Sequence, residues 1–262
     1  MEILVLGATG SLGRSLVREL TSRGHSVRAG SRTDRSADNQ ENVTWVTVDR
    51  ETGAGLERAV TGADAVIDAA NVRSARRSAL DAVLVRGTGT VLDACHAADD
   101  VHYVGISIVG IDDINYIYYK AKVRQERVID AAPGPISLLR ATQFHELVDQ
   151  LLTTAAKLPV MPLPSAMTLQ PIDAADVASR LADAAEDRPA GRLPDIAGPQ
   201  VQTLGELAEQ WATARGRRKK VVRIPLPGRT GKALAAGALC APAHAVRGRT
   251  FAQWLASGEA AG

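Results

Sequence analysis

Hydrophobic and polar positions along the first 140 residues form blocks that predict strands and helices in alternation. Short apolar or β-branched runs indicate strands, whereas longer stretches with one apolar face indicate helices. The predicted strands are 2–6, 26–30, 43–48, 65–71, 101–107 and 136–140. The predicted helices are 14–23, 56–60, 80–98 and 116–132. This alternation is typical of an α/β fold of the Rossmann type, with a doubly wound parallel sheet.

The pattern becomes less regular in the second half of the chain. Prolines exclude a helix interior over 158–164, and helices are predicted over 173–186, 203–213 and much of the last forty residues. Short strands are expected at 194–198 and 221–224. Because no clear linker separates the halves, we expect one domain. We expect its Rossmann-type region over 1–145 and a smaller, mixed C-terminal region over 146–262 that forms a substrate cleft.

A glycine-rich turn follows the first predicted strand directly and opens the first helix. Gly7 permits a tight turn, Gly10 lets the backbone approach a phosphate, and Gly13 allows the helix to pack close to the sheet. Free N–H groups at the start of the helix face the anion. The pattern therefore predicts that a dinucleotide binds at Gly7, Thr9, Gly10, Ser11, Leu12 and Gly13; a purely structural turn is the alternative.

The end of the second predicted strand indicates which dinucleotide binds. A site for NAD usually places a carboxylate there to accept the ribose hydroxyls, but the chain reads Ser31, Arg32 and Thr33, with no acid before Asp34. Hydroxyls and a guanidinium suit a 2′-phosphate, which favours NADP(H). The alternative is that Arg32 is a solvated loop residue.

Residues after the third and fourth strands are further cofactor candidates. Asp49 could touch the adenine, although a turn carboxylate is nearly as well supported. Ala69 and Ala70, followed by Asn71, are small enough for a ribose to pack against the strand end, or they serve simple packing.

Candidate chemistry lies about a hundred residues after the glycines. Ser107 ends the fifth strand, and Tyr118 and Lys122 are neighbours on one face of the next helix. A tyrosine beside an ammonium is a plausible proton donor, and the serine hydroxyl could orient a substrate carbonyl. Gln143, Phe144 and His145 follow the sixth strand, where a substrate cleft should open. A lone histidine is more often structural, and the histidines show no metal spacing.

Three stretches carry a family resemblance. They are the glycine turn, Ile106-Ser107-Ile108-Val109-Gly110 and Tyr118-x-x-x-Lys122, which together resemble the short-chain dehydrogenase/reductase superfamily. The runs 118–122, 139–144 and 170–178 are similar to its atypical, NmrA-like branch. The resemblance implies a Rossmann fold that binds NAD(P)(H). It also implies that Ser107 orients the substrate, Tyr118 acts as acid/base, and Lys122 activates the tyrosine and binds the ribose.

The chain departs from the family pattern in two places. Leu84 stands where many active members carry an asparagine, and the interval from Ser107 to Tyr118 is shorter than usual. We therefore expect an NADPH-dependent oxidoreductase that reduces a small, mostly apolar carbonyl, enone or quinone. Two alternatives stay open, namely a non-catalytic NADP-binding redox sensor and an NAD-dependent epimerase or dehydratase.

Charge, cysteine spacing and hydropathy limit the kinds of partner that the chain is expected to bind. A net charge of +2 over 262 residues gives no reason to expect nucleic acid, and 217–220 is interpreted as a solvated basic connector. Cys95 and Cys240 show no metal or redox spacing, so both are expected to be reduced thiols and no metal is expected. The first strand begins directly after Met1, and no apolar run could span a bilayer. We expect a cytoplasmic protein without a membrane partner, as a monomer or small homo-oligomer.

Overall fold

The computed structural model describes residues 1–72, 74–217 and 220–258, which form two compact units. The first unit comprises Met1–Ser107, Tyr116–Leu139 and Val177–Pro194. The second comprises Ile108–Asn115, Arg140–Asp176 and the described residues from Asp195 onwards. Both units are discontinuous in the sequence. The division at residue 145 into a cofactor region and a substrate region stays a prediction about function.

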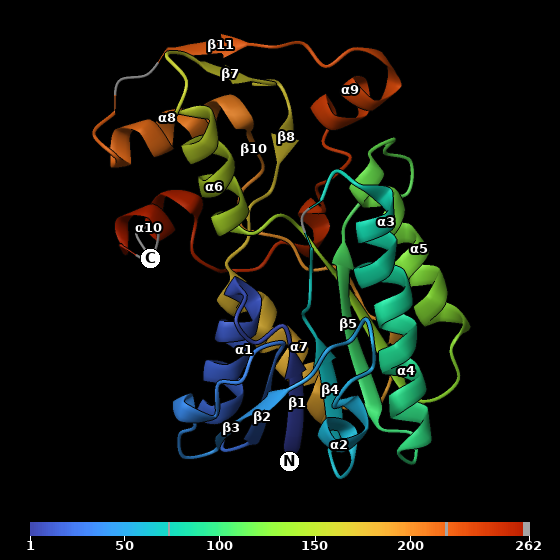
Figure 1. Cartoon of the computed structure of the whole chain (residues 1–262). Coiled ribbons are helices and arrows are strands. Elements are labelled where there is room, and N and C mark those ends of the chain that lie inside the picture. Colours follow the sequence, from blue (N-terminus) through green and yellow to red (C-terminus); the bar gives the residue numbers. More distant parts are fainter. Residues whose placement is uncertain (73, 218–219, 259–262) are drawn as a thin grey trace. The chain divides into compact units, whose positions relative to one another are not determined.

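The first unit is built on a seven-stranded sheet in the order β3-β2-β1-β4-β5-β6-β9 (Figure 1). The strands are β1 (Glu2–Leu6), β2 (Ser26–Ser31), β3 (Val43–Thr47), β4 (Ala65–Asp68), β5 (His102–Ile108), β6 (Ile136–Ala141) and β9 (Gly191–Arg192). The pairs β1–β2, β1–β4, β2–β3, β4–β5 and β6–β9 are parallel. Ile3, Leu4 and Val5 are fully buried, as expected of a central strand covered on both faces. The predicted Rossmann-type fold is confirmed.

Helices cover both faces of this sheet (Figure 1). They are α1 (Ser11–Ser22), α2 (Leu56–Val60), α3 (Arg77–Leu80), α4 (Gly87–Ala97), α5 (Ile117–Ala131) and α7 (Ala174–Glu186). Leu12, Leu16 and Leu20 recur every four residues along α1 and are all buried, which docks that helix on the sheet. The predicted helix 80–98 is divided by a π-helical segment, η2 (Asp81–Arg86), between α3 and α4.

The strand registers align the carboxyl ends of the central strands. Leu6 pairs with Gly30 on one side and with Asp68 on the other, and Asp68 pairs with Gly105. The residues that follow these positions therefore emerge at one edge of the sheet. This edge, between β1 and β4, is where the strand order reverses, and open α/β sheets bind ligands at such a point.

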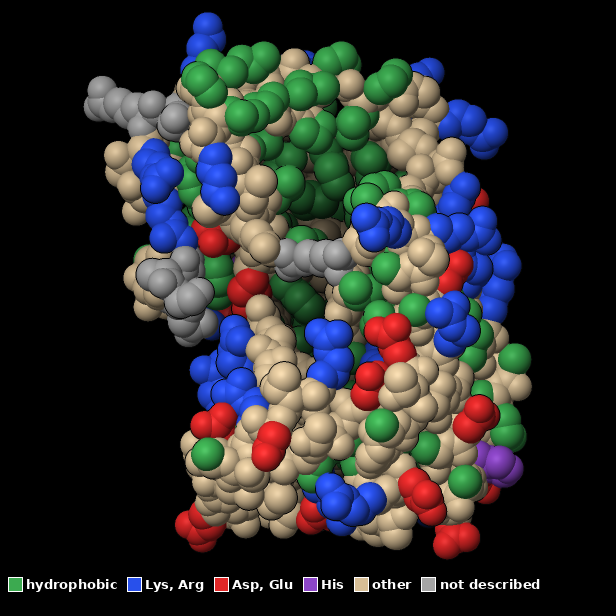
Figure 2. Space-filling model, in the orientation of Figure 1, with side chains coloured by type: hydrophobic (Ala, Val, Ile, Leu, Met, Phe, Trp, Pro, Cys, Tyr) green, Lys and Arg blue, Asp and Glu red, His purple; other side chains and the backbone are tan. Residues whose placement is uncertain are grey.

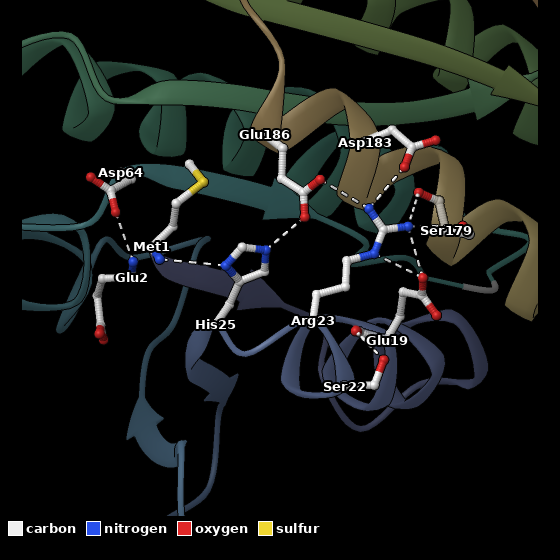
Figure 3. Close-up of polar contacts among 10 residues, drawn as sticks. All are labelled: Met1, Glu2, Glu19, Ser22, Arg23, His25, Asp64, Ser179, Asp183 and Glu186. Atoms are coloured by element: carbon white, nitrogen blue, oxygen red, sulfur yellow. Dashed lines mark hydrogen bonds and ion pairs between the residues drawn. The ribbon is translucent and has the colours of Figure 1, made fainter.

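Polar contacts tie α1 to α7 on one face of the sheet (Figure 3). Arg23, which caps α1, donates to Glu19 and Asp183 at 2.8 Å and to the Ser179 hydroxyl at 2.9 Å. His25 lies 2.7 Å from Glu186, whose pKa is lowered by that hydrogen bond and by Arg23. The cluster joins residues about 160 positions apart, although its partial exposure limits the stability it adds.

The second unit is built from short helices and strands. They are α6 (His145–Ala155), β7 (Met161–Leu163), β8 (Thr168–Leu169), β10 (Gln202–Thr203), α8 (Leu204–Ala214), β11 (Val221–Arg223), α9 (Gly228–Ala235), η3 (Pro242–His244) and α10 (Phe251–Ala256). β7 pairs with β11 in parallel, and β8 pairs with β10 antiparallel. Trp211, Phe251 and Trp254 are buried and are the large aromatic side chains of this unit's core.

One expectation for the second half needs correction, and one helix there was not predicted. The strand predicted at 194–198 does not form, because Ile196 and Ala197 make only isolated bridges and the nearby strand is β9. α6 was not anticipated at all. Its buried positions, such as Val148 and Leu152, recur at helical spacing, a pattern that indicates a helix ending before the prolines of 158–164.

Candidate functional site

The glycine turn has the geometry that a phosphate cradle requires. Gly7 has a φ of +76°, and a Cβ built on it would lie 2.8 Å from the Ala70 backbone. A Cβ on Gly13 would lie 2.1 Å from the Gly7 oxygen, so the absence of a side chain lets α1 sit directly on the turn. At Gly10, by contrast, the Gly7 oxygen at 3.3 Å is the only described atom within 4 Å of a built Cβ apart from atoms of Gly10 and its two chain neighbours.

The start of α1 is open to an anion. Gly10 is the N-cap, and among the described residues no side chain caps the helix, so the first N–H groups are left available to an anion. Arg14 donates to the Thr9 oxygen at 2.6 Å and holds the turn from the first helical turn. With Ser11 and Leu12 opening the helix, the residues predicted to bind the pyrophosphate are contiguous and fit that group.

The ends of β2 and β3 lie at the same sheet edge. The Ser31 hydroxyl accepts the Thr33 N–H at 3.2 Å, and Arg32 between them is exposed. The Asp49 carboxylate accepts the backbone N–H groups of Glu51 at 2.8 Å and of Thr52. These bonds close a tight turn and favour the turn alternative for Asp49 over contact with an adenine.

The end of β4 brings together residues predicted for the cofactor and for catalysis. Ala69 continues the pairing with β1 through its N–H to the Leu6 oxygen, and the next residue is Ala70. Asn71 follows, and its side-chain oxygen accepts a hydrogen bond from the Tyr118 hydroxyl at 3.0 Å. Tyr118 at the start of α5 therefore faces the strand end predicted to contact the ribose.

Ser107 occupies the carboxyl end of β5 with an unsatisfied hydroxyl. The residue is 3% exposed, and its oxygen has no hydrogen-bond partner among the described residues. A buried hydroxyl without a partner is unfavourable, so such atoms at a ligand-binding edge suit a group that arrives with the ligand.

Lys122 lies on α5 one turn after Tyr118, and its ammonium is buried. It donates to the Ile106 oxygen at 2.8 Å and to the Gln125 side-chain oxygen at 2.7 Å. These bonds use two of its three donors. Burial lowers the pKa of Lys122 to about 8, despite the opposing charge of Asp68. The lysine can therefore change its charge near neutral pH.

A buried polar network extends from Lys122 back to β4. Gln125 donates to the Thr88 hydroxyl at 2.9 Å, and the same oxygen accepts from Arg50 at 2.8 Å. Arg50 also donates to Asp68 at 2.6 Å, in an ion pair whose side chains are 8% and 0% exposed. Asp68 and Arg50 in turn bind the N–H and the oxygen of Ala70. The buried Arg50–Asp68 pair therefore holds the predicted ribose contact at Ala70. Through Thr88 and Gln125 it also supports the predicted catalytic lysine.

Sequence reasoning missed this network. Gln125 lies three residues after Lys122, a spacing that places both on one helix face and could have suggested the contact. Arg50 and Thr88 carry no such signal, because their partners are distant in the sequence. Leu84, where an asparagine was expected, is fully buried in an apolar cluster with Leu80.

The substrate candidates belong to the second unit and are mostly buried. Gln143 donates to the Leu239 oxygen at 3.1 Å, and Phe144 is the N-cap of α6. His145 is completely buried, with its ring 5.7 Å from the rings of both Phe251 and Trp254. Burial lowers the pKa of His145. This environment favours the structural alternative for the histidine.

Other sequence expectations concern metals, thiols and membranes. Within the described ranges, no group of three or more His, Cys, Asp or Glu side chains could hold a metal ion. Cys95 and Cys240 are free thiols, and burial raises their pKa values to about 12 and about 11. Among the described helices, none is long and apolar enough to cross a membrane. Of the basic connector 217–220, Arg218 and Lys219 lie outside the described residues.

Two curated proteins are similar in sequence to most of this chain. A divinyl chlorophyllide a 8-vinyl-reductase, chloroplastic, from Oryza sativa subsp. indica is 26% identical over 247 residues, covering 86% of this chain and 61% of the relative. A photosystem II assembly factor, Ycf39, from Trieres chinensis is 24% identical over 234 residues, covering 86% and 73%. The chain therefore spans about three fifths of the length of the rice reductase.

Solved structures share the fold at low sequence identity. A short-chain dehydrogenase/reductase superfamily protein from Agrobacterium tumefaciens with bound NAD has a TM-score of 0.76 at 18% identity, covering 98% of this chain and 95% of that one. An NADPH-dependent quinone oxidoreductase from Escherichia coli has a TM-score of 0.73 at 18% identity, covering 98% and 99%. These matches confirm the fold implied by the superfamily resemblance.

A protein-family model matches more than half of this chain and shows the family to which it belongs. The model described as NAD(P)H-binding matches residues 7–188, from the first glycine of the turn to just beyond the end of α7. That stretch contains the glycine cradle, the end of β4, Ser107 and the Tyr118–Lys122 pair. The chain belongs to the NAD(P)H-binding family.

Proposed function

We propose that the protein is an NADPH-dependent oxidoreductase that reduces a small, mostly apolar carbonyl, enone or quinone. The observation that carries this proposal is the 3.0 Å hydrogen bond from Tyr118 to Asn71, which joins a candidate proton donor to the predicted cofactor edge. Family membership supports nucleotide binding. The names of the rice vinyl-reductase and the bacterial quinone oxidoreductase support a redox reaction.

Each residue of the site has a proposed part. The nicotinamide cofactor, when bound, supplies the hydride. Tyr118 gives a proton from its hydroxyl to the reduced substrate. The Ser107 hydroxyl, which has no hydrogen-bond partner in the described part of the chain, orients the substrate carbonyl. Lys122 provides a buried positive charge one helical turn from Tyr118, and Gln125 fixes its position. Because catalysis needs fixed geometry, the rigid support under Lys122 favours turnover.

Turnover is tested by following NADPH consumption against a panel of quinones, enones and ketones. Tyr118→Phe should lower kcat about 100-fold or more, the usual contribution of a general acid, while NADPH still binds. Tyr116→Phe is the matched control, since Tyr116 is exposed and precedes α5. Equal activity of Tyr118→Phe and the wild type would contradict the assigned role.

The same panel separates the alternatives. NADPH that binds tightly but is consumed with none of the substrates would favour the non-catalytic redox sensor, and the name of the assembly-factor relative likewise refers to no reaction. NAD that copurifies with the protein, with no net oxidation of added nucleotide sugars, would favour an epimerase or dehydratase. Either result would replace the reductase proposal.

The preference for NADPH over NADH rests on the exposed Arg32 at the end of β2. Loss of a charged hydrogen bond to the 2′-phosphate is expected to raise the NADPH Kd about 10-fold or more in Arg32→Ala, with the NADH Kd unchanged. Arg58→Ala on α2 removes the same charge from another exposed position and serves as the control. If the ratio of the two Kd values is the same in Arg32→Ala as in the wild type, the 2′-phosphate is bound elsewhere.

A further inference from the structure

An exposed strip of aliphatic side chains runs along the β7–β11 pair of the second unit. We call it the apolar strip, and its members are between 39% and 49% exposed: Leu158, Val160, Val222, Ile224 and Leu226. Figure 2 shows hydrophobic side chains gathered over these strands, with Lys and Arg side chains at the border. An apolar patch on a folded surface is more informative than single exposed residues, because it indicates a binding face.

The strand pairing explains why these side chains gather. Pro162 of β7 is registered with Val222 of β11, and side chains alternate along a strand, so Val160 and Ile224 point to the same outward face. Met161 and Leu163 point to the opposite face and are buried. The strip is thus the uncovered side of a sheet whose other side belongs to the core.

Cations surround the strip, and acids are missing from the chain segments that form it. Lys157, Lys220 and Arg229 are exposed and lie within three residues of a strip residue in the sequence, whereas Arg223 is registered with Leu163 and so points to the opposite face. Residues 150–172 and 210–258 contain no Asp or Glu at all, although the whole chain has a net charge of only +2. The cations at the strip therefore meet no acid from their own segments, which leaves them to attract an anionic partner.

The composition distinguishes between possible partners. Protein interfaces are enriched in Tyr, Trp and Arg and depleted in Lys, whereas the strip holds only aliphatic side chains and two of its three cations are lysines. Single-stranded nucleic acid binds by stacking bases on aromatic rings, and the strip offers none. Aliphatic side chains flanked by Lys and Arg suit the boundary between acyl chains and negative headgroups.

We propose that the apolar strip and its three cations, Lys157, Lys220 and Arg229, form a surface that lies against an anionic lipid bilayer. Val222 and Ile224 enter the headgroup boundary, and the cations lie over anionic headgroups. The contact is peripheral and requires no spanning helix. It departs from the sequence-based expectation of no membrane partner, because strip residues some sixty positions apart come together only through the pairing of β7 with β11. It does not depend on the proposed reductase activity.

Flotation of the full chain with lipid vesicles tests the proposal. The protein should float with vesicles of equal parts phosphatidylcholine and phosphatidylglycerol, and much less with phosphatidylcholine alone. High salt should release it, because screening shortens the reach of the cations. Each cation near an anionic surface contributes about fivefold in binding, so Lys157→Gln with Lys220→Gln should weaken partitioning about 25-fold.

Two further double variants complete the test. Val222→Ser with Ile224→Ser should also reduce flotation, without changing the thermal midpoint, since both side chains are exposed. Arg58→Gln with Lys120→Gln removes the same charge from the first unit and should float like the wild type. The proposal is overturned if anionic vesicles do not float the protein or if all variants float alike. It is equally overturned if the Val222/Ile224 variant dissociates a dimer seen by analytical ultracentrifugation, because the strip would then join two copies.

Discussion

Replacement of Gly10 by alanine should weaken NADPH binding while leaving the fold nearly intact. Gly10 has φ −76° and ψ 170°, a conformation that alanine adopts readily, and the built Cβ meets only the Gly7 oxygen at 3.3 Å. The structural cost is the loss of glycine as N-cap of α1, about 1 kcal/mol or less. For a chain of this size that corresponds to a decrease in Tm of about 2–4 °C at most.

The effect on binding is larger because the added methyl group fills the approach to the start of α1. A pyrophosphate held away from those N–H groups loses a charge-assisted hydrogen bond, about 1.5–3 kcal/mol. The Kd for NADPH should therefore rise about 10- to 100-fold, measured by isothermal titration calorimetry beside a thermal melt of the same sample.

Gly13→Ala is the matched comparison. Its Cβ would lie 2.1 Å from the Gly7 oxygen, a backbone atom that cannot rotate away, so α1 must shift from the turn. Overpacking of this kind costs about 1–3 kcal/mol or more, and Tm should fall well below that of Gly10→Ala. The reasoning is refuted if Gly10→Ala binds NADPH as tightly as the wild type. It is also refuted if Gly10→Ala unfolds as readily as Gly13→Ala, because Gly10 would then be a structural glycine.

Three further predictions concern stability. Arg50→Met should lower the free energy of unfolding in urea by about 3–5 kcal/mol, because it leaves the buried Asp68 carboxylate without its ion-pair partner; a loss below 1 kcal/mol would show that the pair is solvated. The pKa of Lys122 is about 8 in the folded protein and 10.5 in an ordinary environment. Between these pH values the unfolded chain binds more protons than the folded protein, so the free energy of unfolding rises with pH, by up to about 3 kcal/mol. Urea unfolding of Lys122→Met and of the wild type between pH 8 and 10.5 should show the rise only in the wild type. An identical pH dependence of the two proteins would mean that another group causes it. Thr203→Ala should lower Tm by about 2–4 °C, since Thr203 caps α8 in a capping box with Glu206, and Thr203→Ser should restore it.

The first half of the fold could be predicted because local patterns there agree with the tertiary structure. β1 is a continuous apolar run, the glycine turn follows at once, and α1 repeats leucines at helical spacing, so each element signals itself. The second half could not be predicted as well. Ile196 reads as part of a strand, yet its hydrogen bond to the Arg140 oxygen yields only a bridge to β6, because the chain leaves the sheet there. Short elements depend on what they pack against more than on their own propensity.

The candidate site likewise has features that the sequence predicts and others that it does not. Tyr118 and Lys122 are four residues apart, so their common helix face follows from helical geometry alone. The position of Asn71 opposite the Tyr118 hydroxyl depends on the parallel registers that bring the strand ends together, and no local pattern encodes it. His145 shows the converse, since its place after a strand suggested a substrate contact, whereas packing encloses the ring completely.

By itself, the sequence determined the glycine turn, the succession of strands and helices, and the membership in a nucleotide-binding family. Only the tertiary structure decided that Lys122 rests on Gln125 and, through Thr88, on the buried Arg50–Asp68 pair. Helix and strand periodicity is a local property of the chain and can be read along it. The burial of Lys122 and its hydrogen bonds depend on segments far apart in sequence, and so on the order and register of the strands that bring those segments together.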